Sequence, residues 1–80
     1  MSEESFETTD IGLACYLRYE NMEIIGLKDF PTDFRRKVFC FSDLEKCQEL
    51  KSDYYNDRIF VSPIGLLSIM KILKSMIYNS

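Results

Sequence analysis

A stretch near the C-terminal end of the 80-residue chain constrains its fold more than any other part. Ser62 can accept a hydrogen bond from an early helical N–H, and Pro63 suits the first helical position, where a missing N–H costs nothing. Residues 62–78 therefore predict an amphipathic helix, with Leu73 at the centre of a stripe that covers an apolar core. The stripe recurs at helical spacing at Leu66, Ile69, Met70, Leu73, Met76 and Ile77.

Two more helices are predicted from residues that favour helix starts. Thr8 or Thr9 can cap a first helix with Asp10 in its first turn, where the helix dipole favours an anion. Ser42 and Glu45 form the pattern of a capping box, which opens a second helix. The last helix is then the third in the chain.

Strands are predicted between the first two helices. Residues 23–28 and 36–41 are rich in the β-branched and aromatic side chains that favour strands, and the turn between them contains Pro31. Residues 58–61 are also predicted to be extended, and the sequence leaves open whether they form a third strand. The predicted fold class is α+β, with a small antiparallel β-hairpin packed with three helices in the order α-β-β-α-(β)-α.

The second of these strands has apolar residues on both faces. Val38 and Cys40 point one way, and Phe39 and Phe41 point the other way. Such a strand belongs either to a sheet that is covered on both sides or to an interface.

Acidic residues are concentrated at the N-terminal end. Residues 1–10 contain four acidic residues and no basic residue, whereas the net charge of the whole chain is only −3. We therefore expect a flexible acidic arm over residues 1–8, followed by a single domain over residues 9–80.

The composition lacks the side chains that catalysis most often uses. There is no histidine, which removes the commonest general base and a common zinc ligand. The three glycines form no phosphate-binding loop, and no carboxylate lies in an apolar run that would raise its pKa. We expect no enzymatic activity, no cofactor and no metal site.

The cysteines bear on the cellular compartment. Cys15, Cys40 and Cys47 form an odd set without the spacing of a metal site. No basic-then-apolar run precedes the cysteines, so we expect no secretion leader, and no apolar run approaches the ~20 residues that span a membrane. We expect buried, reduced cysteines in a cytoplasmic protein.

Two places are candidates for contact with another protein. One lies near the end of the second helix, and the other is a line on the last helix in which two lysines stand between two apolar residues. Either place could equally be a solvated surface on which long side chains cover apolar area. The candidate partner-binding residues are Tyr55, Arg58, Leu67, Lys71, Lys74 and Tyr78.

Arg35, Arg36 and Lys37 form the one basic cluster. At the mouth of the hairpin they could bind phosphate, with Phe34 and Tyr55 as surfaces for base stacking. The same charges could instead protect an edge strand from aggregation, and the net negative charge is atypical of nucleic-acid binding. Nucleic-acid binding is therefore the alternative to protein binding.

Several segments resemble a family of short uncharacterised phage and bacterial proteins, a domain of unknown function. They follow the pattern TTD-x-x-LA-x-YL, then YYN, VSP and LKS-x-IY, within residues 8–17, 54–57, 61–63 and 73–78. The resemblance covers most of the chain beyond the acidic arm. It implies a prokaryotic or phage source and no established activity, and it transfers no catalytic residue.

From these observations we expect a small non-enzymatic protein that acts by binding another protein. The resemblance suggests a host or defence factor as the partner, in the host cytoplasm if a phage encodes the chain. A second copy of the chain is a further partner to consider. We expect no contact with a membrane.

Overall fold

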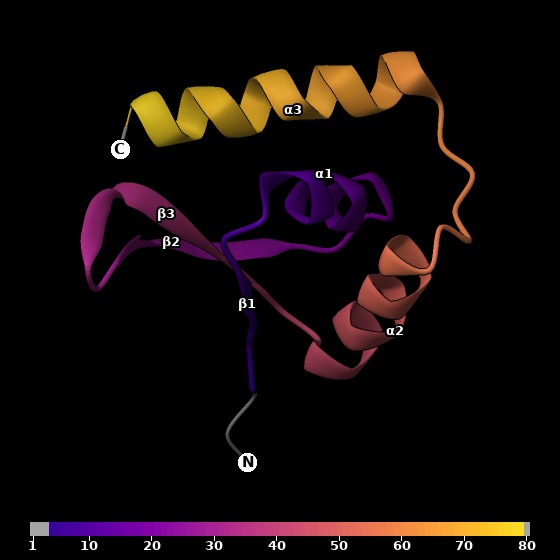
Figure 1. The fold of residues 1–80 in the computed structure, drawn as a ribbon, viewed down its shortest axis with the longest axis horizontal. Coiled ribbons are helices and arrows are strands. Elements are labelled where there is room, and N and C mark those ends of the chain that lie inside the picture. The colour runs from indigo at the N-terminus through magenta and orange to yellow at the C-terminus, as the bar shows by residue number, and fades with distance from the viewer. Residues whose placement is uncertain (1–3, 80) are drawn as a thin grey trace.

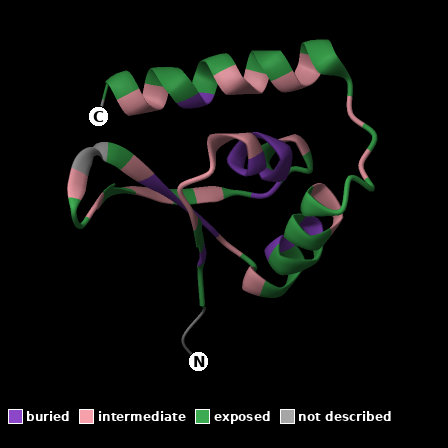
Figure 2. Cartoon of the chain, viewed as in Figure 1, coloured by how far each residue is buried: buried purple, intermediate pink, exposed green. Residues whose placement is uncertain are grey.

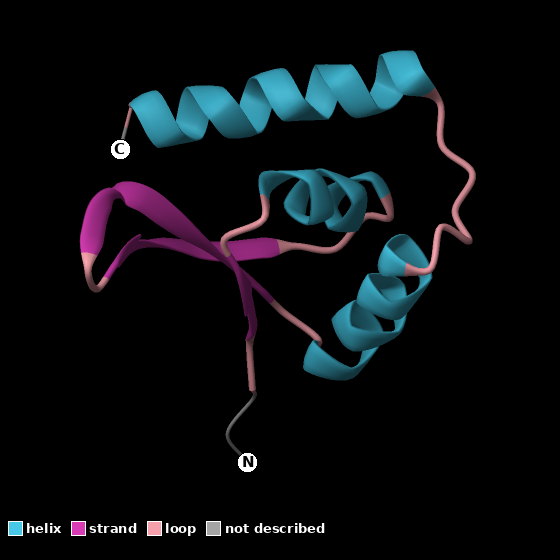
Figure 3. Ribbon diagram, viewed as in Figure 1, coloured by secondary structure: helices cyan, strands magenta, loops and turns pink. Residues whose placement is uncertain are grey.

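The computed structural model describes residues 4–79, and the side chains of all of these except residues 34 and 35. It confirms the α+β class and the three predicted helices (Figures 1 and 3). The strands form one antiparallel sheet in the order β1-β3-β2. In chain order the elements are β1 (Phe6–Thr8), α1 (Ile11–Tyr19), β2 (Ile24–Phe30), β3 (Asp33–Phe41), α2 (Leu44–Tyr55) and α3 (Pro63–Tyr78).

The third strand is at the N-terminal end and not at residues 58–61. Phe6 pairs with Phe41 and Thr8 pairs with Phe39, and the Phe6 ring is buried in the core. Phe6–Thr8 therefore belong to the sheet rather than to the predicted flexible arm, of which residues 1–3 lie outside the described part of the chain.

Residues 58–61, all of which are described, form no strand, and this answers the question that the sequence left open. The segment links α2 to α3 instead. The Arg58 N–H donates to the Asp53 carbonyl at 2.9 Å, which continues the hydrogen bonding of α2 beyond its last turn, and the side chain of Phe60 is 97% exposed.

The caps of the first two helices each differ from the prediction. Asp10, not a threonine, caps α1, and its side chain accepts hydrogen bonds from the backbone N–H groups of Gly12 and Leu13. Asp43, not Ser42, caps α2. The Ser42 N–H is held by the Glu23 carbonyl at 3.1 Å, and this bond keeps Ser42 with the sheet and moves the start of the helix one residue along.

Helix α1 is the centre of the molecule. Its residues from Leu13 to Leu17 are all buried, and it packs against α3, α2 and β1. In Figure 1 it lies between α3 and the strands, and Figure 2 shows it as the most buried helix. Gly12 permits a close approach of α2, because a Cβ at this position would lie 2.5 Å from the Tyr54 hydroxyl.

Helix α3 begins as predicted. The Ser62 hydroxyl accepts a hydrogen bond from the Gly65 N–H, and Pro63 occupies the first turn. Of this helix, all of which is described, only Leu73 is buried, at 1% exposure. The other residues of the predicted apolar stripe are partly buried against the same core: Leu66, Ile69, Met70, Met76 and Ile77.

The helices cover one face of the sheet. Phe39 and Phe41 belong to the core cluster that contains α1, whereas Val38 and Cys40, which are also buried, do not. Val38 stands opposite Lys28 in the register, and Cys40 stands opposite Glu7 and Gly26. The second face is therefore shielded by strand side chains, including the Lys28–Glu7 ion pair at 2.5 Å, and not by a helix.

The burial of Leu73 gives a first prediction. Leu73→Ala should lower the free energy of unfolding in urea by about 2–5 kcal/mol, because it leaves a cavity between α3 and the core. The neighbouring Ile72→Ala is the matched control; its side chain is 61% exposed, and we expect a loss below about 1 kcal/mol. Equal losses for the two variants would contradict this packing.

The cysteines give a second prediction. Cys15, Cys40 and Cys47 are buried free thiols, and burial raises the pKa of each. Since the thiolate is the reactive form, a thiol reagent should label the folded protein slowly. In denaturant and without prior reduction, all three thiols should react. A count below three under these conditions would show that a disulfide exists.

Candidate functional site

Helix α3 exposes several large apolar side chains outside the stripe that contacts the core. Ile64 is 79% exposed, Leu67 is 58% exposed and Tyr78 is 84% exposed. Phe60, just before the helix, is almost fully exposed as well. Isolated exposed apolar residues are ordinary, but a cluster along one helix is typical of a binding surface.

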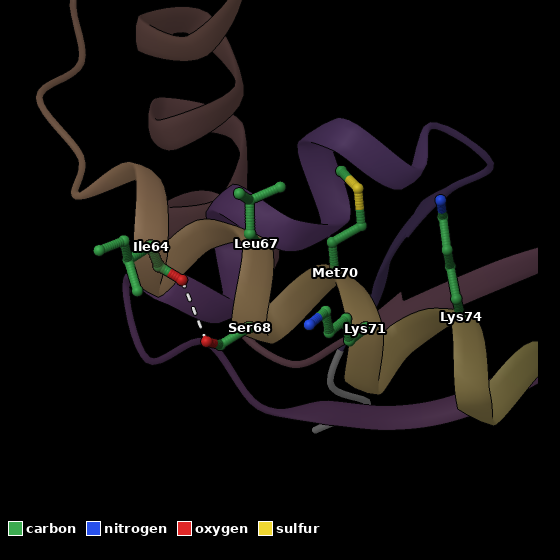
Figure 4. A pocket seen from close by; sticks show the side chains of 6 residues that line it. All are labelled: Ile64, Leu67, Ser68, Met70, Lys71 and Lys74. Atoms are coloured by element: carbon green, nitrogen blue, oxygen red, sulfur yellow. Dashed lines mark hydrogen bonds between the residues drawn. The ribbon is translucent and has the colours of Figure 1, made fainter.

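A shallow hollow of about 370 Å³ lies on this surface (Figure 4). Leu67, Met70 and Lys74 project from the same side of α3, and the Ser68 hydroxyl donates to the Ile64 carbonyl at 3.0 Å, which keeps this polar side chain against its own helix. We call the surface formed by this hollow and the exposed Tyr78 the α3 surface. The residues that line the hollow are Ile64, Leu67, Ser68, Met70, Lys71 and Lys74.

The two lysines of the α3 surface are exposed, and within the described part of the chain neither has an ion-pair partner. Residues 63–78 also contain no acidic residue. The α3 surface is thus apolar and positively charged. Of the six predicted partner-binding residues, three line the hollow, namely Leu67, Lys71 and Lys74, and Tyr78 follows on the same line of the helix.

Tyr55 and Arg58 do not line the hollow, and both have partners of their own. The Tyr55 hydroxyl donates to the Asp10 carboxylate at 2.5 Å, and its ring lies edge-on against Tyr54. The bond to Asp10 raises the pKa of Tyr55 to about 12 and lowers the pKa of Asp10. Arg58 lies 3.5 Å from Asp53. Tyr55 therefore ties α2 to the N-terminus of α1.

Two residues of the basic cluster on the hairpin already interact with other residues of the chain. The Arg36 guanidinium lies 4.8 Å from the centre of the Phe30 ring and donates to the Thr9 hydroxyl, and Lys37 forms an ion pair with Asp29. The side chains of Phe34 and Arg35, which the nucleic-acid alternative also uses, lie outside the described part of the structure. Two of the three predicted phosphate contacts thus already have protein partners.

The described residues were also compared with the requirements of metal and membrane sites. Among them, no group of three cysteine or acidic side chains is placed to hold a metal ion. None of the helices in residues 4–79 has both the length and the apolar character that a membrane span requires.

Comparison with known proteins identifies the family. Residues 3–79 match the family described as "Domain of unknown function (DUF5659)". The chain belongs to the DUF5659 family. This confirms the resemblance to an uncharacterised family, and the match includes β1 and nearly all of the chain. No curated protein and no solved structure matches this DUF5659 chain.

The sequence did not predict the full extent of the α3 surface of this DUF5659 domain. Met70 was expected to face the core and Ile64 was assigned to no face, but both line the hollow. Met70 does both, because it is partly buried against the core and borders the hollow. Ile64 lies nine residues before the buried Leu73 and therefore on the opposite side of the helix, so helical spacing was the signal that could have identified it.

The Tyr55–Asp10 bond predicts how stability depends on pH. The pKa of Asp10 lies below its ordinary 3.8, so the contribution of this bond is present above pH 3.8 and is lost as the pH falls through the folded pKa. The pKa of Tyr55 rises from 10.0 to about 12, so the contribution is present below pH 10.0 and is lost as the pH rises toward 12. Urea unfolding of wild type and Tyr55→Phe should therefore differ by a constant amount between about pH 5 and pH 9, and by less outside this range.

Asp10→Asn is the matched control for this experiment, because asparagine also caps a helix but carries no charge. In the Asp10→Asn background, the effect of Tyr55→Phe should not change between about pH 3 and pH 7. An effect in wild type that is also the same at these two pH values would show that the bond does not form in solution.

Proposed function

We propose that this protein acts by binding another protein through the α3 surface, without catalysing a reaction. The observation that carries the proposal is the exposure of Ile64, Leu67 and Tyr78 along one side of a helix that is otherwise anchored to the core. Burial of one such side chain contributes about 1.5–3 kcal/mol, so that a partner that covers them gains affinity from the hydrophobic effect.

The absence of buried charged groups supports a non-enzymatic role. Among the described residues, no Asp, Glu, Lys or Arg side chain is buried. An active site usually contains buried titratable groups with shifted pKa values. The buried titratable groups of the described residues are Tyr16 and the three cysteines, and burial raises the pKa of each, which favours the uncharged form. The raised pKa of Tyr55 comes from its hydrogen bond to Asp10.

Free buried cysteines are in keeping with the proposed cytoplasmic location, where thiols stay reduced. The proposal that the partner is a host or defence factor, bound after expression from a phage or prokaryotic genome, follows from the resemblance alone. The test below therefore identifies the partner directly.

Leu67→Ala tests the proposed function. Tagged wild-type chain and variants are incubated with lysate of the natural host cell. The retained proteins are quantified by mass spectrometry. Leu67→Ala should reduce the retained partner by about fivefold or more, because it removes a central apolar contact. Ile25→Ala, on β2 and 52% exposed, is the matched control and should retain the wild-type amount. Equal retention by wild type, Leu67→Ala and Ile25→Ala would refute binding through α3.

The nucleic-acid alternative is tested by replacing Arg35, Arg36 and Lys37 together with alanine. This triple change should leave the affinity for the retained protein within about tenfold, because these residues lie on the hairpin and not on α3. If nucleic acid is the ligand, the same change should reduce the slope of log affinity against log salt concentration by ~2–3 units. A loss of that size would replace the proposed function with the alternative.

A further inference from the structure

We propose that the partner presents an amphipathic helix with acidic residues beside its apolar face, and that this helix lies along the α3 surface. The inference rests on the function proposed above and specifies the chemistry of the partner. It depends on the distribution of charge, on the spacing of the exposed residues and on the cost of placing a second copy of the chain on the same surface.

Charge is divided unequally along the chain. All thirteen acidic residues and eight of the ten basic residues precede Pro63, so that residues 1–62 have a net charge of −5 and residues 63–80 have a net charge of +2. Three of the basic side chains in residues 1–62 are neutralised locally, in the pairs Lys28–Glu7, Lys37–Asp29 and Arg58–Asp53. The positive charge of α3 is not neutralised in this way within the described residues.

The two lysines stand among the exposed apolar side chains. Lys71 and Lys74 are three residues apart and therefore lie on the same face of α3, and both line the hollow with Ile64 and Leu67. A partner that buries Leu67 must bring its own side chains close to these ammonium groups. Carboxylates at those positions gain from the charge, and basic side chains lose by it.

The spacing of the exposed residues fits a helix better than an extended strand. Leu67, Lys71, Lys74 and Tyr78 recur after four, three and four residues and make a ridge, which with Ile64 is about 21 Å long. Residues that recur at alternating spacings of four and three form the seam along which a second helix packs in a coiled coil. A partner helix of about four turns would cover the whole ridge.

A second copy of the chain fits the same surface less well. In a symmetric antiparallel pair of α3 helices centred on the ridge from Ile64 to Tyr78, Lys71 of one copy stands opposite Lys71 of the other. Helix α3 contains no acidic residue that could neutralise these two ammonium groups. The two facing ammonium groups repel each other and oppose association of two copies. An acidic partner helix would instead place carboxylates next to the same lysines, and these contacts are favourable.

The test uses two designed peptides of about 20 residues that share the same leucines at heptad spacing. One carries glutamates beside the leucines and the other carries lysines there. Binding to the full chain is measured by fluorescence anisotropy at low and at physiological salt. The acidic peptide should bind at least about tenfold more tightly than the basic peptide, and salt should reduce the difference.

Charge reversal on α3 makes the test specific. The double variant Lys71→Glu, Lys74→Glu should bind the basic peptide more tightly than the acidic one. The double variant Lys46→Glu, Lys51→Glu carries the same change of net charge on α2 and should keep the wild-type order. An unchanged order in the α3 variant, or binding of neither peptide by wild type, would overturn the inference.

Two other outcomes separate this inference from the proposed function. If both peptides bind equally and Leu67→Ser weakens both, α3 docks helices but does not select acidic ones, and only the inference fails. If sedimentation shows a dimer of the chain that Leu67→Ser dissociates, the occupant is a second copy, and the inference is again wrong. Equal retention of the lysate partner by wild type and Leu67→Ala counts against the proposed function, and the peptide measurements distinguish that failure from a failure of the inference.

Discussion

The all-round burial of α1 is the constraint on which the rest of the structure depends. Successive residues of a helix are 100° apart, so the five buried residues from Leu13 to Leu17 point in every direction around its axis. The sheet can cover only one side of such a helix. The other sides need α2 and α3, and this explains why an 80-residue chain places a 16-residue helix across the outside of its core.

This arrangement leaves α3 exposed. The molecule measures 34 × 32 × 19 Å, and it is therefore flat, with no element beyond α3 in the described part of the chain to cover its outer side. The helix meets α1 with Leu73 and the partly buried residues around it, while Leu67 and Ile64 stay in solvent. The exposed apolar surface of α3 thus follows from its role as a cover for α1, and a partner can use it without any change in the core.

Features that depend on neighbours in sequence were predictable. The Ser62 cap, Pro63 and the burial of Leu73 follow from local spacing, and so does the exposure of Leu67, Lys71 and Lys74. Features that depend on distant residues were not. Whether Phe6–Thr8 or residues 58–61 complete the sheet depends on the position of β3 relative to both, and Tyr55 meets Asp10 across 45 residues of sequence. Ser42 is a suitable N-cap by local rules, but its N–H bonds to Glu23 across the fold, and Asp43 caps the helix instead.

The lysines of α3 have to satisfy two requirements at once. Before the partner binds, an uninterrupted apolar ridge from Ile64 to Tyr78 would favour self-association, and Lys71 and Lys74 interrupt it with strongly hydrated charges. When the partner binds, these charges must either remain at the rim or meet carboxylates, because an unpaired buried ammonium group is costly. Both requirements are met if the partner is acidic and the chain itself carries no carboxylate on α3. The same two residues then keep the free protein apart from its own copies and select the partner that it binds.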